Sequence, residues 1–151
     1  MATEGVVVEV VESVDQGLVD AWERLLPQLS RSAAAVTSAV LREIVESNAT
    51  SLLVARVDGV IAGSLTLVAF PLPTGRCAWI EDVVVDEAVR GRGVGEALTR
   101  AAVARSAVLG ARTVDLTSRP SRAAANRLYQ RVGFEARETT VYRHATAERP
   151  E

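Results

Sequence analysis

Lysine is absent from the sequence, and all 17 basic residues are arginines. This excludes any mechanism that requires a lysine amine, and it excludes the phosphate-binding P-loop, which needs Gly-Lys-Ser or Gly-Lys-Thr. Cysteine and histidine occur once each. Cys77 has no partner for an internal disulfide and His144 cannot form a metal site alone, so we expect neither a disulfide framework nor a bound metal.

Targeting and nucleic-acid signals are missing as well. The N-terminus lacks the basic start and uninterrupted apolar core of a signal peptide, and no apolar run is long enough to cross a membrane. The formal net charge is -2 at pH 7, whereas nucleic-acid-binding domains are usually strongly basic. We therefore expect a cytoplasmic protein without a membrane or nucleic-acid partner.

The residues that are present suit one compact domain. The chain has 151 residues, of which 48% are hydrophobic and 24% charged, so it can bury a full core without metals or disulfides. We expect a single domain over residues 1–151, with residues 146–151 forming a loose tail.

The first half of the chain predicts a strand, two helices and a hairpin. Residues 5–11 are β-branched, and apolar residues then recur at helical spacing over 18–29 and 36–45. Pro27 and residues 30–32 are expected to interrupt the first helix. Residues 51–57 and 60–70 are strand-like, and Asp58-Gly59 between them is typical of a tight hairpin turn.

The second half predicts a strand, a helix and a parallel strand. The strand covers residues 76–85, the helix runs from 93 to about 109, and the next strand covers 113–117. Such a unit forms a right-handed crossover, so the two strands should lie side by side. Ser121 is expected to cap a last helix that ends at Gly133, and residues 134–145 read as a closing strand or hairpin.

A glycine-rich turn links the buried strand to the long helix, with the sequence Arg90-Gly91-Arg92-Gly93-Val94-Gly95. Alternate glycines let a ligand approach the backbone, and the helix N-terminus and two arginines favour an anion such as pyrophosphate. A plain glycine-rich connection is the alternative. A dinucleotide-binding fingerprint fails, because Glu96 stands where its third glycine should be.

Two further sequence motifs lie on either side of this turn. Residues 79–134 resemble the GCN5-related N-acetyltransferase (GNAT) superfamily in the strand Ile80-Glu81-Asp82-Val83-Val84-Val85-Asp86, the loop Arg90-x-x-Gly93-x-Gly95 and the second signature Ala125-x-x-Leu128-Tyr129-x-x-x-Gly133-Phe134. The resemblance implies an α/β fold. Its mixed, mostly antiparallel sheet would have about six or seven strands and a splayed central parallel pair that holds coenzyme A (CoA), flanked by about four helices.

The closest resemblance within the superfamily is to glucosamine-6-phosphate N-acetyltransferases and small bacterial relatives. The loop at residues 118–122 departs from the amino-sugar enzymes, so the substrate is not carried over. Many members also have an asparagine where this chain has Arg122. The cofactor-binding residues that the resemblance implies are Val83, Val84, Val85, Arg90, Gly91, Arg92, Gly93, Val94, Gly95, Glu96, Asn126 and Tyr129.

Two side chains are candidates for proton transfer. The resemblance places Tyr129 as the proton donor to the departing sulfur. Glu81 is a candidate base, but it could equally anchor the substrate ammonium or be a plain surface residue. Strand alternation predicts that Glu81 shares one face with Val83 and Val85, while Asp82 points the other way.

The resemblance implies an acetyl-CoA-dependent N-acetyltransferase that moves acetyl to a primary amine by direct attack in a ternary complex. An acyl-CoA-binding or sensing module without catalysis is an alternative, and a protein N-terminus or lysine is an alternative acceptor. By family analogy, a second subunit would complete the short closing segment, which would give a homodimer.

Overall fold

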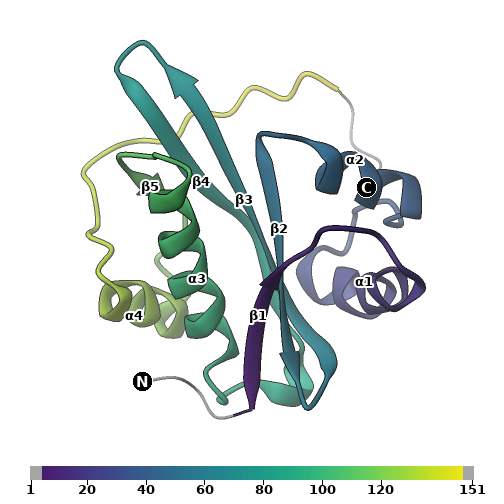
Figure 1. Cartoon of the computed structure of the whole chain (residues 1–151). Helices are drawn as coiled ribbons and strands as arrows, with labels where there is room; N and C mark the ends of the chain where they lie inside the picture. Colours follow the sequence, from purple (N-terminus) through teal and green to yellow (C-terminus); the bar gives the residue numbers. More distant parts are fainter. Residues whose placement is uncertain (1–4, 148–151) are drawn as a thin grey trace.

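The computed structural model describes residues 5–147 and forms one mixed sheet flanked by helices (Figure 1). The sheet has five strands in the order β1-β2-β3-β4-β5. The elements in chain order are β1 (Val6–Val10), α1 (Gln16–Leu29), α2 (Ser38–Glu46), β2 (Thr50–Val57), β3 (Val60–Leu72), β4 (Gly75–Val85), the short 3-10 helix η1 (Glu87–Val89), α3 (Val94–Val108), β5 (Val114–Asp115) and α4 (Ala123–Val132).

Helices cover both faces of the sheet. Strands β1 to β4 are antiparallel neighbours, and β5 joins β4 in parallel through the crossover that contains α3. Helices α1 and α2 lie on one side of the sheet and α3 and α4 on the other (Figure 1). Two clusters of buried side chains fill the two interfaces. These observations confirm the α/β fold, the four helices and a parallel pair of strands, although β4 and β5 lie at the edge of the described sheet and not at its centre.

The number of strands differs from the expected six or seven. Strand β5 has only two residues, and residues 134–147 form no strand. Beyond Phe134, whose N–H donates to Tyr129 O at 2.9 Å, no backbone hydrogen bond joins this segment to the rest of the described chain. A strand requires a ladder partner, and this single chain provides none for its closing segment. The predicted closing strand or hairpin is therefore wrong for the isolated chain.

Two predicted helix boundaries are also wrong. Pro27 lies inside α1, because in the last turn of a helix a proline removes only one hydrogen bond near the frayed end. Ser121 does not cap α4; the N-cap is Arg122, without a side-chain hydrogen bond. Gly133 ends α4 in the left-handed conformation as expected, with φ 111°. Residues 148–151 of the predicted tail lie outside the described residues.

Among residues 5–147, no helix has the length and apolar character needed to cross a membrane. The same residues contain no group of three or more His, Cys, Asp or Glu side chains placed to hold a metal ion.

Candidate active site

At the start of α3, the glycine turn leaves backbone N–H groups without a hydrogen-bond partner among residues 5–147. Gly91 and Gly93 have φ 81° and 79°, a conformation that strongly favours glycine. Gly93 is the N-cap of α3 and provides no side-chain acceptor, and the first backbone bond of the helix runs from Ala97 N to Gly93 O at 3.0 Å. The N–H groups of Val94, Gly95 and Glu96 are therefore left for a ligand, next to the positive end of the helix dipole.

Charge and shape at the turn also suit an anion. Arg90 and Arg92 are exposed and make no ion pair with any residue in 5–147. Gly95 permits close packing, because a Cβ there would lie 3.3 Å from Leu128 Cδ1 of α4. Val94 is fully buried and fixes the start of α3 against the sheet. The turn therefore combines unpaired backbone amides and unpaired guanidinium groups with a helix start that is packed against the sheet.

Strand β4 contains a bulge at Asp82, whose φ is 48°. Between two paired positions, β3 advances from 64 to 66 while β4 advances from 81 to 84, so β4 holds one extra residue. The extra residue reverses the alternation of side chains. Val83 and Val85 consequently pack with the core on the α3 side, as Ile80 does, whereas Glu81 lies on the α1 face. The prediction that Glu81 shares a face with these valines is wrong for this reason.

In the part of the chain that the structure describes, the end of β4 has unpaired backbone groups on the side that faces β5. Asp86 N–H donates to Ala62 O of β3 at 2.8 Å, and successive residues direct their backbone groups to opposite edges. The groups of Val83 and Val85 therefore face away from β3. On that side β5 pairs only with Ala78 and Trp79, so residues 80–85, which pair with β3 on their other side, have no strand partner there within the described chain.

Val84 is placed differently from the two valines beside it. By the same alternation from Asp86, its backbone groups face β3, and its side chain is buried on the α1 side. Of these three predicted cofactor contacts, the structure places the backbone groups of Val83 and Val85, but not those of Val84, on the open edge of β4.

Tyr129 of α4 follows Leu128, whose side chain approaches Gly95 together with that of Val85. Tyr129 is 8% exposed, and its ring meets Phe134 edge-on with centroids 6.0 Å apart. Its hydroxyl makes no hydrogen bond with the described residues. Asn126, one turn earlier, donates from Nδ2 to Arg119 O at 3.1 Å and so supports the loop that precedes α4. A packed ring with a free hydroxyl suits proton donation.

The acetyltransferase (GNAT) family model matches residues 14–134, which include the loop, the open strand edge and Tyr129. The chain belongs to the GNAT acetyltransferase family. The search of curated proteins found no match.

Solved GNAT structures share the fold over nearly the whole chain. A Trypanosoma brucei acetyltransferase is 26% identical, with a TM-score of 0.73 and coverage of 93% of this chain and 99% of that one. An aminoglycoside acetyltransferase from an uncultured soil metagenomic sample is 20% identical, with a TM-score of 0.82 and coverage of 95% and 97%. An aminoglycoside N-acetyltransferase solved with CoA is 18% identical, with a TM-score of 0.75 and coverage of 97% and 100%.

Glu96 of this GNAT domain is engaged by two arginines rather than free. Arg131 of α4 and Arg100 of α3 donate to its two carboxylate oxygens at 3.2 and 3.4 Å. The hydrogen bond from Arg131 is the main reason that the pKa of Glu96 is lowered, with a smaller effect from Arg100. The carboxylate next to the anion seat is therefore ionised and partly neutralised, and only its backbone N–H remains for a ligand.

The sequence patterns did not indicate a contact between Asp86, which follows β4, and Arg24 of α1. The carboxylate of Asp86 accepts hydrogen bonds from Ala88 N–H at 3.1 Å and from Arg24 Nε of α1 at 2.9 Å. The Ala88 N–H bond, followed by the Arg24 bond, lowers the pKa of Asp86. An aspartate directly before a short turn indicates that its carboxylate caps the turn, as Asp86 does. Its contact with Arg24, 62 residues earlier in the chain, has no such local signal.

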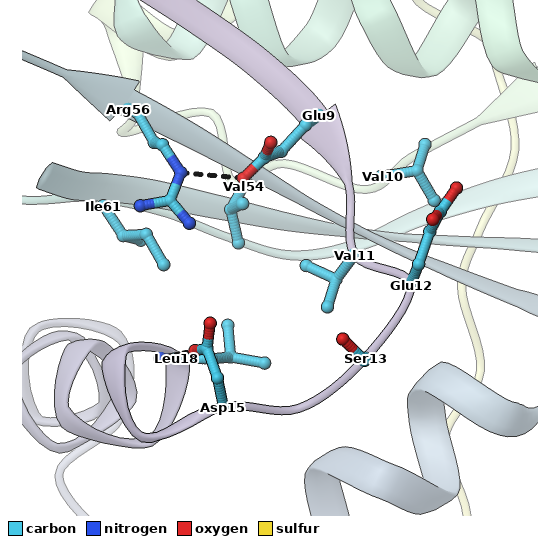
Figure 2. A pocket seen from close by; sticks show the side chains of 10 residues that line it. All are labelled: Glu9, Val10, Val11, Glu12, Ser13, Asp15, Leu18, Val54, Arg56 and Ile61. Atoms are coloured by element: carbon cyan, nitrogen blue, oxygen red, sulfur yellow. Dashed lines mark hydrogen bonds and ion pairs between the residues drawn. The ribbon is translucent and has the colours of Figure 1, made fainter. Parts of the chain in front are cut away.

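A cavity of about 530 Å³ lies elsewhere, between the end of β1 and the start of α1 (Figure 2). Its walls include three carboxylates, but Glu9 pairs with Arg56 at 2.7 Å and Asp15 accepts a hydrogen bond from Leu18 N at 2.8 Å. None of the predicted site residues lines it. The cavity is therefore separate from the GNAT loop, none of whose residues lines it.

Proposed function

We propose that this protein transfers the acetyl group of acetyl-CoA to a primary amine by direct attack in a ternary complex. The observation that carries the proposal is the open edge of β4 at Val83 and Val85, which ends in a helix N-terminus with two positive-φ glycines and two free arginines. Strand-like backbone groups followed by an anion seat suit an extended amide-containing arm that ends in a pyrophosphate.

Acetyl-CoA, when bound, supplies the acetyl group as an activated thioester. The residues around the open edge would then have distinct tasks. Backbone groups of Val83 and Val85 would bind the arm of the cofactor, and the amides at Val94, Gly95 and Glu96, with Arg90 and Arg92, would bind its phosphates.

Glu81 would serve on the α1 face, either as the base for the amine proton or as the anchor for an ammonium. The neutral amine nitrogen forms a bond to the acetyl carbonyl carbon while the carbon–sulfur bond breaks. The proton of the amine passes to Glu81 or to water, and Tyr129 O–H gives a proton to the sulfur and regains one from solvent. Acceptor and cofactor would thus enter from opposite faces of β4, because the bulge at Asp82 separates Glu81 from the two valines.

Calorimetric titration with CoA and a CoA-release assay over amino sugars, polyamines, amino acids, aminoglycosides and peptides test this proposal. We expect CoA binding, and CoA release with at least one amine. Binding without release across the whole panel would favour an acyl-CoA-binding module, and release with peptides alone would identify a protein acceptor. A stable acetyl-Cys77 adduct during turnover, detected by mass spectrometry, would contradict direct attack.

We also propose that the chain acts as a homodimer. Residues 135–147 are exposed and lack backbone partners, and Val141 and Tyr142 are 65% and 91% exposed. A second copy could pair with this segment, because an extended chain with free N–H and C=O groups favours a ladder partner. Light scattering should give twice the chain mass for the wild type and a monomer for Val141→Glu. Val108→Glu, at a position 79% exposed on α3, is the control that should stay dimeric.

A further inference from the structure

Two side chains of α1 fasten the segment that leads into the glycine turn. Arg24 donates from Nε to Asp86 Oδ2 at 2.9 Å and from Nη2 to Ile61 O. One turn further along α1, Gln28 Oε1 accepts from Glu87 N–H at 2.9 Å. Gln28 also donates to Arg24 O at 3.2 Å. The two side chains therefore hold consecutive residues, 86 and 87, at the end of β4.

The segment that they hold makes further hydrogen bonds of its own. Asp86 N–H donates to Ala62 O at 2.8 Å, Asp86 Oδ1 accepts from Ala88 N–H at 3.1 Å, and Val89 N–H donates to Asp86 O at 3.0 Å. Asp86 is thus tied to β3, to α1 and to its own turn at once. Its side chain is only 13% exposed, so its charged contact with Arg24 is partly shielded from water.

Beyond this anchor the chain is held again only at α3. Within the described residues, no side chain outside the turn makes a hydrogen bond to residues 90–93. The next residue packed in the core is Val94, which is 1% exposed. The position of the glycine turn is therefore set by its two ends. One end is the start of α3, and the other is the segment clamped to α1 on the opposite face of the sheet (Figure 1).

We propose that Arg24 is a positioning residue for the glycine turn, so that the affinity of the turn for the pyrophosphate of CoA depends on helix α1. This inference rests on the proposed function of the turn. Arg24 acts through Asp86 and does not touch the ligand. Because Glu81 faces α1, the same helix would connect the acceptor side of β4 with the cofactor seat, and binding on either side would influence the other.

The test compares Arg24→Gln with Arg56→Gln. Arg56 forms an ion pair with Glu9 at 2.7 Å at the opposite edge of the sheet, so its loss removes a comparable contact far from the turn. We expect Arg24→Gln to raise the Kd for CoA about tenfold, and Arg56→Gln to change it less than about twofold. The KM for acetyl-CoA should rise in Arg24→Gln, while kcat at saturation stays the same.

Hydrogen exchange provides a readout that needs no ligand. In the free protein, the amides of residues 90–93 should exchange faster in Arg24→Gln than in the wild type or Arg56→Gln, while the interior of α3 keeps its protection. A double-mutant cycle with Asp86→Asn should show that the double variant binds CoA no more weakly than Arg24→Gln alone. Arg24→Lys, which keeps the charge, should recover part of the affinity.

The outcomes separate this inference from the proposed function. If the wild type does not bind CoA, the proposed function fails and this inference fails with it. If the wild type binds but Arg24→Gln binds equally well, or if both arginine variants lose affinity alike, the positioning role alone is overturned. Should Arg24→Gln fail to fold, Gln28→Ala removes the acceptor for Glu87 N–H together with the bond to Arg24 O, and an unchanged Kd in that variant would overturn the dependence of the turn on α1.

Discussion

Arg131 of α4 and Glu96 of α3 form an ion pair, with 3.2 Å between Nε and Oε1. The contact ties the last turn of α4 to the first turn of α3, at the residue after the last of the three glycines. Tyr129 lies two residues before Arg131, so the same contact helps to hold the part of α4 that contains the tyrosine. Arg100 also meets Glu96, at 3.4 Å, but belongs to α3 itself.

Arg131→Gln should therefore lower kcat more than it lowers CoA affinity. We expect a loss of about fivefold in kcat, because the acid would be held less well although the loop is intact. Arg100→Gln is the matched control: it removes the second partner of Glu96 but leaves α4 tied to α3. Equal kcat in the two variants, measured at saturating acetyl-CoA, would contradict this role of the pair.

The second prediction concerns the conformation of Gly91. Gly91 and Gly59 have nearly the same φ, 81° and 82°, and a Cβ added at either would meet nothing within 4 Å. Alanine at each position should cost about 1 kcal/mol of folding free energy, because the left-handed conformation disfavours a Cβ. Only Gly91→Ala should also raise the Kd for CoA, by about tenfold, since relief of the strain moves the loop amides.

Urea unfolding and calorimetric titration of the two alanine variants measure these effects. Gly59 lies in the β2–β3 turn, so its variant reports the cost of the backbone conformation alone. A Gly91→Ala protein that is destabilised but binds CoA like the wild type would show that the loop backbone does not form the anion seat.

The parts of the site that could be predicted from sequence are those encoded locally. The alternate glycines, the buried valines and the helix before Gly133 each determine their own conformation through short-range sterics and periodicity. The strand that ends at Val85, the helix that begins after the glycine turn and the helix that ends at Gly133 lie where these signals predicted them.

The bulge at Asp82 has no local signal, because alternation assumes that every residue of a strand is paired. It arises from the pairing of β4 with β3, and it moved Glu81 to the opposite face from the valines. The contact of Arg24 with Asp86 joins residues that are distant in sequence, and the closing segment lacks a partner within the chain. Each of these depends on tertiary or quaternary pairing, which periodicity does not report.

Asp86 leads to a prediction about pH. The bonds from Ala88 N–H and Arg24 lower its pKa in the folded protein below the ordinary value of 3.8. A lowered folded pKa stabilises the fold at pH above 3.8, and this contribution is lost as the pH falls through the folded pKa. Asp86→Asn should lower the free energy of unfolding by about 1 kcal/mol at pH 7.

The difference between wild type and Asp86→Asn should shrink below pH 4. Urea unfolding at pH 7, 5, 4 and 3 measures it, with Glu87→Gln, an exposed neighbour, as the control that should follow the wild type at every pH. A difference that stays constant down to pH 3 would show that the ionised carboxylate does not provide the stabilisation.

Tyr129→Phe tests the proposed acid with the smallest available change. The substitution removes one oxygen and keeps the buried ring and its edge contact with Phe134, so the thermal unfolding midpoint should stay the same. If the hydroxyl gives a proton to the departing sulfur, kcat should fall about 100-fold while the Kd for CoA changes less than about twofold. Tyr142→Phe removes the same oxygen from a tyrosine that is 91% exposed and should retain full activity.

The change in kcat, compared with the changes in kcat/KM and in the Kd for CoA, shows what the hydroxyl does. A group that acts only as the sulfur leaves lowers kcat and kcat/KM equally, because it contributes nothing to the bound ground state. A group that only binds the cofactor raises KM and Kd and leaves kcat in place. Unchanged kcat in Tyr129→Phe would remove the tyrosine from the chemistry, and the thiolate would then have to take its proton from water at the open edge of β4.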